Sequence, residues 1–368
     1  LKPLGHLSFK IISGNENTNL YYQLKYKKFI MAKIALITGI TGQDGSYLSE
    51  FLIKKGYKVY GIVRRVALED ESHRLWRLRE IRNRINLLAA SLESYASIVK
   101  IIQKIKPNEI YHLGAQSFVD YSFKDEFSTL NTNINGTHYL LSAIKEFSPK
   151  TKFYFAGSSE MFGKVKKTPQ NENTPFHPRS PYGVAKLYAY WITVNYRESY
   201  GIYACNGILF NHESPVRGET FVTRKITRGL ARIKLGLQKN LYLGNLNALR
   251  DWGHAKDYVQ AMWKILQKKK PDDYVISSDK SYTVRFFVEE AYRNIGVKIK
   301  WIGKGINEKG IDKKTNKTII SISKKYFRPN EVDSLRGDSK KAKKEIKWNP
   351  KISFKELVKE MINYEIKS

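Results

Sequence analysis

The chain has 368 residues, 42% of them apolar, and a mean hydropathy of −0.47, which is typical of a globular protein with one large domain or two ordinary ones. The single cysteine, Cys205, excludes an internal disulfide and a thiolate metal cluster, the seven histidines show no zinc-ligand spacing, and no apolar run approaches the roughly 20 residues of a membrane helix. The formal charge of +31 comes mostly from lysines spread along the chain without a nucleic-acid-binding motif, so it is typical of a solvated surface that attracts small polyanions. We expect a cytoplasmic protein with no metal, no membrane segment and no nucleic-acid partner.

Residues 1–30 differ from the rest of the chain, because they lack sustained periodicity and contain the polar break SGNENTN. They have neither the uninterrupted apolar core nor the small-residue cleavage site of a secretory signal. We expect an extension outside the fold that ends before Met31, and a short docking or oligomerisation arm is the alternative.

A strand–turn–helix–strand pattern begins after Met31. The sequence predicts a buried parallel strand at 32–39, a glycine-rich turn at 39–45, an amphipathic helix at 46–56 and a second strand at 57–65. The turn carries three glycines in the spacing GxxGxxG, and their missing side chains let backbone N–H groups and the helix N-terminus approach a pyrophosphate. In this βαβ context the pattern predicts a dinucleotide site that includes Gly39, Gly42 and Gly45.

The second strand ends in Arg64 and Arg65, where an NAD enzyme usually places an acidic residue on the ribose hydroxyls. Two arginines without that acid predict contact with the 2′-phosphate of NADP, and solvated surface arginines are the alternative. A third strand-like run at 108–117 contains His112, which we expect to be a packed strand residue. The run ends in small and polar residues that would pass beneath the cofactor, namely Gly114, Ala115, Gln116 and Ser117.

A second group of residues carries acid–base chemistry. Residues 152–163 predict a strand that runs into a polar loop with Ser158 and Glu160, and residues 180–201 predict a long helix. Tyr182 and Lys186 are four residues apart and therefore share one helix face, where the ammonium is expected to stabilise a phenolate. A simple dehydrogenase needs the Ser, Tyr and Lys but not the Glu, so the carboxylate indicates a second proton transfer, from carbon beside a carbonyl.

Each of these residues also has a structural interpretation. Ser158 could cap a helix, Tyr182 could pack in a core, Lys186 could lie at the surface and Glu160 could pair with an arginine. Their joint occurrence after a dinucleotide motif favours the catalytic interpretation. Because open α/β sheets bind ligands at the carboxyl ends of their strands, this loop is expected to face the nicotinamide.

The chain resembles the extended short-chain dehydrogenase/reductase superfamily and, within its sugar epimerase/dehydratase branch, the GDP-mannose 4,6-dehydratases. The resemblance runs from about Met31 to the C-terminus. It rests on long motifs in the right order: GITGQDGSYL, LGAQS, SSEMFG, SPYGVAKLYAYW, NHESP, RGETFVTRKITR, RDWGHAKDYV and YFRPNEVDSLRGD.

The resemblance implies an NADP-dependent hydro-lyase that converts GDP-mannose to GDP-4-keto-6-deoxymannose and water, in the synthesis of 6-deoxyhexose nucleotides. Tyr182 would take the proton of the 4-hydroxyl, Glu160 would remove the carbon 5 proton, and Ser158 or Glu160 would assist the departing 6-hydroxyl. Further cofactor-binding residues that it implies are Thr41, Gln43, Asp44, Leu92, Leu113, Lys186, His212 and Arg217.

The resemblance also implies a substrate site. Arg250 would clamp the diphosphate, and Arg328 and Glu331 would bind the nucleoside end. Surface ion pairing is the alternative for Arg250 and Arg328. The remaining residues expected to contact the substrate are Ser117, Ser159, Glu160, Tyr182, Asn211, Arg217 and Lys225.

Four positions depart from the family pattern. Ser158 replaces a Thr and keeps the hydroxyl, so function is expected to be retained. Ser91 stands where an Asp precedes Leu92, Val66-Ala67-Leu68 replaces serines after Arg65, and Val216 replaces an arginine. These changes concern cofactor affinity more than the type of reaction.

The predicted architecture is an α/β fold, with a Rossmann-type parallel sheet flanked by helices and a smaller α/β substrate domain. The expected boundaries are 31–205 for the NADP-binding domain, with a return segment at about 245–280, and 206–368 for the domain that mainly binds the GDP-sugar. The resemblance implies a homodimer or homotetramer. The alternative functions are another NDP-sugar epimerase or 4-keto-sugar reductase and, from another class, a non-catalytic NADP-sensing or nucleic-acid-binding protein.

Overall fold

Short apolar runs of the sequence form one parallel sheet in the computed structural model, which describes residues 32–326 and 334–367. The sheet has seven strands in the order β10-β6-β5-β4-β1-β2-β3, and every pair is parallel. Its strands are β1 (Ile34–Thr38), β2 (Lys58–Val63), β3 (Ile85–Ala89), β4 (Glu109–His112), β5 (Lys152–Ser158), β6 (Ala204–Leu209) and β10 (Tyr274–Ile276). The central strands are buried on both faces, which explains why most of their residues are apolar.

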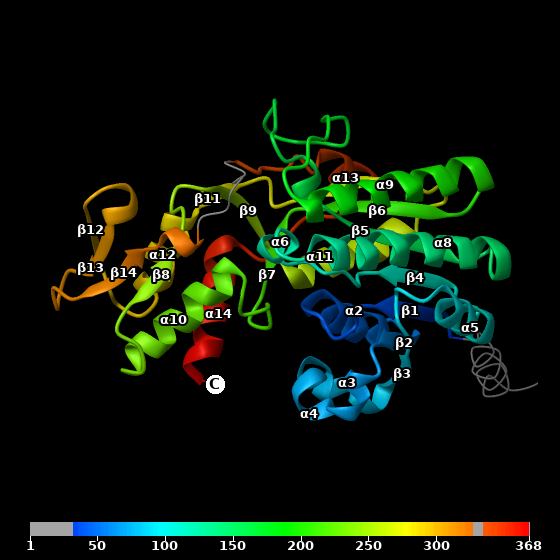
Figure 1. Ribbon diagram of the computed structural model, residues 1–368, viewed down its shortest axis with the longest axis horizontal. Coiled ribbons are helices and arrows are strands. Elements are labelled where there is room, and N and C mark those ends of the chain that lie inside the picture. The colour runs from blue at the N-terminus through cyan, green and yellow to red at the C-terminus, as the bar shows by residue number, and fades with distance from the viewer. Residues whose placement is uncertain (1–31, 327–333, 368) are drawn as a thin grey trace, which may run out of the picture.

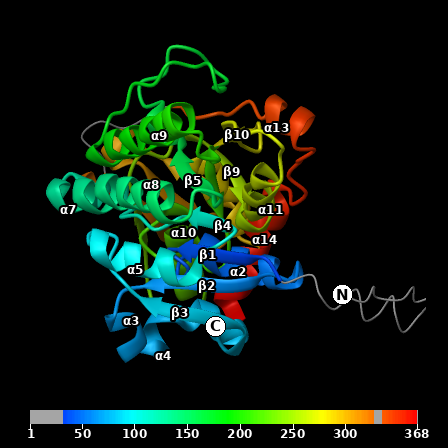
Figure 2. The ribbon, with the colours of Figure 1, turned by 90° about the vertical axis from the view of Figure 1, so that its right-hand side faces the viewer.

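Helices cover both faces of this sheet (Figures 1 and 2). One face carries α5 (Tyr95–Ile105), α8 (Gly136–Phe147) and α9 (Pro181–Tyr200), and the other carries α2 (Gln43–Lys54) and α11 (Ala255–Leu266). The Rossmann-type fold predicted from the sequence is therefore confirmed.

Helix α9, which carries two of the predicted catalytic residues, has clear sequence signals at both ends. The Ser180 hydroxyl accepts a hydrogen bond from the Gly183 N–H at 3.0 Å, and Pro181 occupies the first turn. The helix ends at Gly201, whose φ of 66° is the left-handed conformation that glycine adopts without strain. These ends fix where Tyr182 emerges relative to β5.

Short elements connect the strands of the sheet. Helix α2 begins at Gln43, three residues earlier than the sequence predicts, because the Ser46 N–H already bonds the Gly42 carbonyl at 3.0 Å. The short elements are α3 (Val66–Glu69), α4 (Glu71–Arg74), η1 (Trp76–Arg84), α6 (Val119–Ser122), α7 (Glu126–Leu130), η2 (Asn131–Asn135) and η3 (Ser159–Met161).

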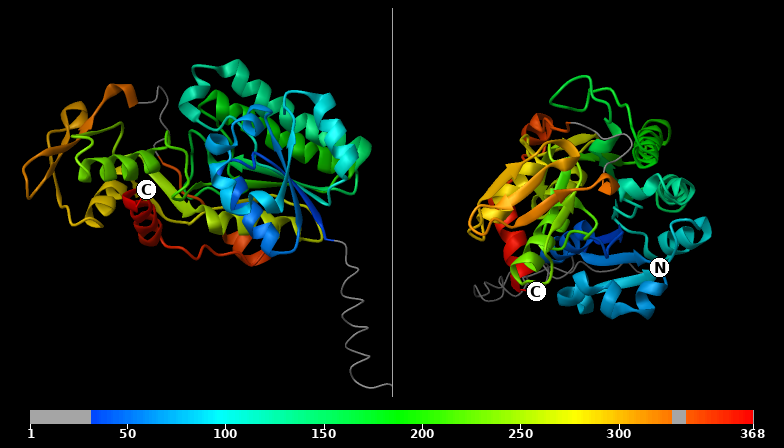
Figure 3. Two further views of the ribbon diagram at one scale, coloured as in Figure 1. Left: turned by 90° about the horizontal axis from the view of Figure 1, so that it is seen from below. Right: turned by 60° about the vertical axis from the view of Figure 1, so that its left-hand side comes forward.

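A second lobe lies beyond the carboxyl ends of the strands (Figure 3). Its four-stranded sheet has the order β12-β13-β14-β8, and its core includes Trp252, Phe287 and Met361. Its strands and helices are α10 (Val222–Lys234), β8 (Leu241–Leu243), α12 (Val284–Arg293), β12 (Ile299–Ile302), η4 (Gly305–Asn307), β13 (Lys309–Asp312), β14 (Thr318–Ile322), η5 (Lys324–Tyr326) and α14 (Phe354–Lys367).

A three-stranded sheet joins the two lobes. It is formed by β7 (Asn211–Glu213), β9 (Leu249–His254) and β11 (Ser281–Thr283), in the order β11-β9-β7. After β9 the chain returns to the first lobe as α11 and β10, and α13 (Lys340–Glu345) packs there as well. No helix among residues 32–326 and 334–367 is long and apolar enough to cross a membrane.

Candidate active site between the lobes

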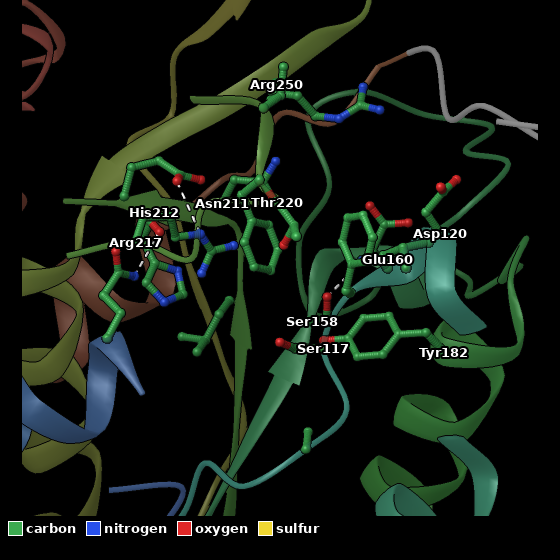
Figure 4. Close-up of a pocket in the computed structure, with 18 of the residues that line it drawn as sticks. Ser117, Asp120, Ser158, Glu160, Tyr182, Asn211, His212, Arg217, Thr220 and Arg250 are labelled. Carbon is green, nitrogen blue, oxygen red and sulfur yellow. Dashed lines mark hydrogen bonds and ion pairs between the residues drawn. The ribbon is translucent and has the colours of Figure 1, made fainter. Parts of the chain in front are cut away.

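A cavity of about 790 Å³ lies at the carboxyl ends of β1, β4 and β5 and extends beneath α10 and β9 of the second lobe. Figure 4 shows Ser158, Glu160 and Tyr182 on one side of it, His212 and Arg217 on the other, and Arg250 at the top of the view. The predicted site residues that line the cavity are Gly39, Thr41, Gly42, Gln43, Asp44, Gly45, Leu113, Ala115, Ser117, Ser158, Glu160, Tyr182, Lys186, Asn211, His212, Arg217, Lys225 and Arg250.

The glycine turn is tight because backbone passes close to backbone. Gly39 has φ 71°, and a Cβ there would lie 2.7 Å from the Gly114 nitrogen. A Cβ at Gly45 would lie 2.4 Å from the Gly39 carbonyl oxygen. The turn therefore needs glycine at both positions, and it leaves the N-terminus of α2 open to an anion in the cavity.

Helix α9 and the end of β5 bring the four predicted catalytic residues together. The Lys186 Nζ donates to the Ala156 carbonyl at 2.8 Å and lies 5.9 Å from the centre of the Tyr182 ring. Tyr182 is hydrogen-bonded to Ser158, whose Oγ also accepts from the Glu160 N–H at 3.2 Å. Ser158 thus caps the short helix η3 and faces the tyrosine at once. Glu160 is 8% exposed and lines the same cavity.

The pKa values of the Tyr–Lys pair differ from the expectation of a phenolate stabilised by an ammonium. Burial raises the pKa of Tyr182 to about 12, although the Ser158 hydrogen bond and the charge of Arg217 lower it. Burial also lowers the pKa of Lys186 to about 7. Both groups lose water within the fold, and desolvation disfavours the charged form of each. In the chain alone, therefore, Tyr182 is a neutral phenol that can donate a proton.

A buried ion pair joins the glycine turn to the segment NHESP. The His212 Nε2 lies 2.7 Å from the Asp44 Oδ2, and its Nδ1 lies 2.7 Å from the Phe210 carbonyl oxygen. Both neighbours are acceptors, so both ring nitrogens must carry protons and His212 is an imidazolium. Burial alone would lower the pKa of His212, but the Asp44 carboxylate raises it above its usual value. Gln43 adds two hydrogen bonds between the glycine turn and this segment. Its side-chain nitrogen donates to the His212 carbonyl at 3.1 Å, and its side-chain oxygen accepts from the Ser214 hydroxyl at 2.7 Å.

The half of the cavity toward the second lobe is rich in cations. Arg217 forms an ion pair with Glu213, its Nε lying 3.1 Å from the carboxylate. Arg250 is buried on β9 rather than at the surface, and its Nη1 donates to the Leu249 carbonyl. Burial and the charge of Lys325 lower the pKa of Lys225 to about 8. These groups suit a phosphate-bearing ligand.

Several predicted residues lie outside the cavity wall. Arg64 and Arg65 are exposed after β2, and the Arg65 Nε donates to Glu69 at 2.8 Å. Leu92 packs against Gly114, so it supports the strand end beneath the cavity. Ser159 is buried, and its Oγ has no hydrogen-bond partner among the described residues.

Gln116 also lies outside the cavity wall, and its side-chain amide bonds both the N–H and the carbonyl of Phe118. His112 is a packed strand residue as expected, bonded to Thr38 and Thr137 within the fold. Arg328 and Glu331 lie outside the described residues.

The cavity wall also includes residues that the sequence did not point to. Phe118 and Phe221 face each other across it, with ring centres 5.9 Å apart. Asp120 on α6 and Lys325 and Tyr326 of η5 line it as well. Phe221 stands inside the motif RGETFVTRKITR, which could have flagged it, whereas Asp120 has no local signal. In the described part of the chain, no group of three His, Cys, Asp or Glu side chains is arranged to hold a metal ion.

Comparison with known proteins places these features in one family. Residues 36–361 match the family model described as GDP-mannose 4,6 dehydratase. A GDP-mannose 4,6-dehydratase of Vibrio cholerae is 51% identical over 345 residues, which cover 90% of this chain and 92% of that protein.

Two solved structures show the same fold at lower identity. A dTDP-glucose 4,6-dehydratase of Bacillus anthracis in complex with NAD has a TM-score of 0.75 and 21% identity, over 91% of this chain and 97% of its own. The RMD protein of Pseudomonas aeruginosa complexed with NADPH has a TM-score of 0.73 and 21% identity, over 92% and 100%. Identities this low bear on the fold alone.

Proposed function

The chain belongs to the GDP-mannose 4,6-dehydratase family, and we propose which of its residues convert GDP-mannose to GDP-4-keto-6-deoxymannose and water. The enzyme is a hydro-lyase of this family. The proposal rests on one observation above all. Glu160 lines the same cavity as Ser158, Tyr182 and Lys186, so a carboxylate is present beside the tyrosine where a simple dehydrogenase has no use for one.

A nicotinamide dinucleotide fits the glycine turn, because glycine at 39 and 45 lets backbone pack closely against backbone there and leaves the N-terminus of α2 open to the cavity. When bound, it supplies an acceptor for the hydride of carbon 4 and returns that hydride to carbon 6. We propose NADP rather than NAD, because Arg64 and Arg65 stand exposed at the end of β2. In this assignment residues 31–205 mainly hold the dinucleotide, and 206–368 mainly hold the GDP-sugar.

Tyr182 acts as the base for the 4-hydroxyl of mannose. Ser158 donates a hydrogen bond to it, and Arg217 lowers its pKa through its charge. Tyr182 is a neutral phenol in the chain alone, so it first releases its own proton to solvent and then, as a phenolate, accepts the proton of the 4-hydroxyl. Lys186, held by the Ala156 carbonyl, stabilises that phenolate.

Glu160 acts on the oxidised sugar. The 4-keto group acidifies the carbon 5 proton, which the Glu160 carboxylate removes. The 6-hydroxyl then leaves as water, protonated by Ser158 or Glu160. The η3 turn fixes the position of Glu160, because its backbone N–H bonds the Ser158 hydroxyl.

The nucleotide part of the substrate is assigned to the cationic half of the cavity. Arg250 is proposed to bind the diphosphate, with Asn211 and Lys225 beside it. Arg217, which also lines this half, is proposed to lie between substrate and cofactor. Ser117 is proposed to contact the sugar.

The test is the mass of the product. Purified protein given GDP-mannose, without added reductant, is expected to release a nucleotide sugar about 18 mass units lighter, which is one water. Unchanged mass with inverted stereochemistry would show an NDP-sugar epimerase instead. Oxidation of added NADPH when a 4-keto nucleotide sugar is the substrate would show a reductase.

A Glu160→Gln variant provides the control for the carboxylate. Its rate of dehydration is expected to fall by about 100-fold or more, because one acid–base group contributes about that much to the rate. Some oxidation at carbon 4 is expected to remain. Dehydration at the normal rate in this variant would remove the role proposed for Glu160.

The protein is also proposed to act as a homodimer or homotetramer in the cytoplasm. Apolar side chains stand exposed on neighbouring helices of the first lobe, with Phe127 of α7 79% exposed and Trp191 of α9 55% exposed. Large apolar side chains exposed together in this way often mark an interaction site. The one cysteine, Cys205, is buried and free, which suits a reducing compartment.

A further inference from the structure

Two aromatic rings from opposite lobes are in contact at one side of the cavity. Phe118 follows β4 in the first lobe, and Phe221 precedes α10 in the second. Their ring centres are 5.9 Å apart and their planes are inclined by 72°, the edge-to-face geometry that aromatic pairs favour. Both residues line the cavity, so this contact closes one side of it.

The Arg217 guanidinium lies directly on the Phe221 ring. Its central carbon is 3.6 Å from the ring centre, which is the distance of a stacked cation–π contact. The Arg217 Nε lies 3.1 Å from the Glu213 carboxylate but forms no hydrogen bond of good geometry with a described residue. The ion pair therefore holds the charge near Glu213, and the stacked ring constrains the plane of the guanidinium.

The backbone on both sides of the pair is built to hold the rings. The Phe118 N–H donates to the Gln116 side-chain oxygen at 2.6 Å, and the Gln116 amide in turn donates to the Phe118 carbonyl at 3.3 Å. On the other side, the Phe221 N–H bonds the Gly218 carbonyl at 3.1 Å. A Cβ at Gly218 would lie only 3.2 Å from two carbons of the Phe221 ring, so glycine there makes room for the ring.

We propose that Phe221, in contact with the Phe118 ring, is a positioning residue that fixes the plane of the Arg217 guanidinium so that its edge faces the diphosphate of a bound nucleotide. A planar guanidinium binds phosphate oxygens through its edge, and stacking leaves that edge free while fixing its direction. This inference rests on the function proposed above for Arg217, and it assigns to Gln116 a supporting task in place of a cofactor contact.

The experiment is a double-mutant cycle on the full chain. Phe221→Leu keeps the apolar volume but removes the aromatic face, and Phe221→Tyr keeps the face. Each is made in the natural protein and in Arg217→Met, and dissociation constants for NADP and for GDP are measured by calorimetric titration. Titration of NADP alone and of GDP alone distinguishes the cofactor diphosphate from the substrate diphosphate.

Phe221→Leu is expected to weaken binding of one of the two nucleotides about tenfold, within the range for a partly desolvated cation–π contact. In the Arg217→Met background the same change is expected to alter binding less than about twofold, because its effect passes through the arginine. Phe221→Tyr is expected to bind both nucleotides like the natural protein. An equal loss in both backgrounds, or no loss with Phe221→Leu, would overturn the inference.

A second variant guards against a folding defect. Gly218→Ala leaves the ring in place but must displace it by a few tenths of an ångström, and it is expected to weaken the same nucleotide in the same direction, with an unchanged unfolding temperature. Unchanged binding of both nucleotides by this variant would count against the inference. If the natural protein does not dehydrate GDP-mannose, the proposed reaction fails while these titrations still decide the role of Phe221.

Discussion

Asp44 and His212 form the ion pair that links the cofactor turn to β7, in the sheet that joins the two lobes. The pair is largely buried, its N–O distance is 2.7 Å, and the imidazole is stacked on Tyr258 with ring centres 4.4 Å apart. Burial would raise the pKa of Asp44, but His212 lowers it below its ordinary value, and Asp44 in turn raises that of His212. Each charge is therefore stable in the fold only because of the other.

These opposite shifts define a window of pH. Because the folded pKa of His212 is raised, its contribution to stability is complete below its unfolded pKa of about 6.5 and is lost as the pH rises through the folded value. Because the folded pKa of Asp44 is lowered, its contribution is complete above about 3.9 and is lost as the pH falls through the folded value. The pair stabilises the fold most between about pH 4 and pH 6.5.

Asp44→Asn is expected to lower the free energy of unfolding by about 3 kcal/mol inside that window, as for other buried pairs that lose one partner. The difference from the natural protein should shrink as the pH rises, because His212 then loses its proton in both. Urea denaturation at a series of pH values measures this. Asp70→Asn is the matched control, since Asp70 and His73 form an exposed pair at the same 2.7 Å, and it should change stability little at any pH.

The residues that the sequence identified have one feature in common: the type of side chain and its spacing along the chain are enough to predict the role. Tyr182 and Lys186 are four apart on a helix, so their common face is predictable from the spacing alone. The pKa values of Tyr182 and Lys186 cannot be predicted in this way, because their desolvation depends on which elements of the fold cover them. Gln116 shows the same limit, since its amide was free to face the cofactor or Phe118 and only the folded loop decides.

At the scale of elements, the turn between β1 and α2 is the part most sensitive to a single methyl group. A Cβ at Gly45 would lie 2.4 Å from the Gly39 oxygen and 2.5 Å from the Ile40 Cα, and both are backbone atoms that cannot rotate away. The start of α2 would have to move away from β1. Its N–H groups would then no longer point at a bound pyrophosphate.

Gly45→Ala is therefore expected to weaken NADP binding by about 100-fold or more, as for a site that loses two of its backbone hydrogen bonds to a charged group at about 1.5 to 3 kcal/mol each. Titration of the purified variant with NADP measures this. Glu50→Ala, on the same helix but away from the cavity wall, is the control and should bind NADP normally. Normal affinity in Gly45→Ala would show that the pyrophosphate does not sit at this turn.

The elements of the first lobe were more predictable than those of the second. Continuous apolar strands such as β5 and a capped, periodic helix such as α9 carry strong local signals. The sheet β12-β13-β14-β8 does not, because its strands are three to five residues long and two of them are half exposed. Their pairing is fixed by distant partners, such as β14 against β8, and no local pattern reveals that.

At the scale of the whole molecule, the cavity is lined by residues of both lobes and neither lobe forms it alone. Asp44 of the first lobe pairs with His212, Phe118 meets Phe221, and the η3 turn carries Glu160 toward the cations of the second lobe. Each lobe has its own apolar core, so each can pack without the other. The catalytic residues belong to the first lobe, but the cavity that would hold a nucleotide sugar beside them needs both lobes.

The outer face of α7 and α9 exposes large apolar side chains, and we expect a second copy of the chain to cover it. Figure 2 shows these helices side by side on the outside of the first lobe, and Val184 and Trp191, seven residues apart, share one face of α9.

Trp191→Glu is expected to convert the oligomer to a smaller species, because a desolvated carboxylate in an apolar interface costs several kcal/mol. Sedimentation velocity at micromolar concentration measures this. Tyr242→Glu is the control, since Tyr242 is 52% exposed on β8 of the other lobe, and it should sediment like the natural protein. Equal sedimentation of all three would place the contact between copies on another face.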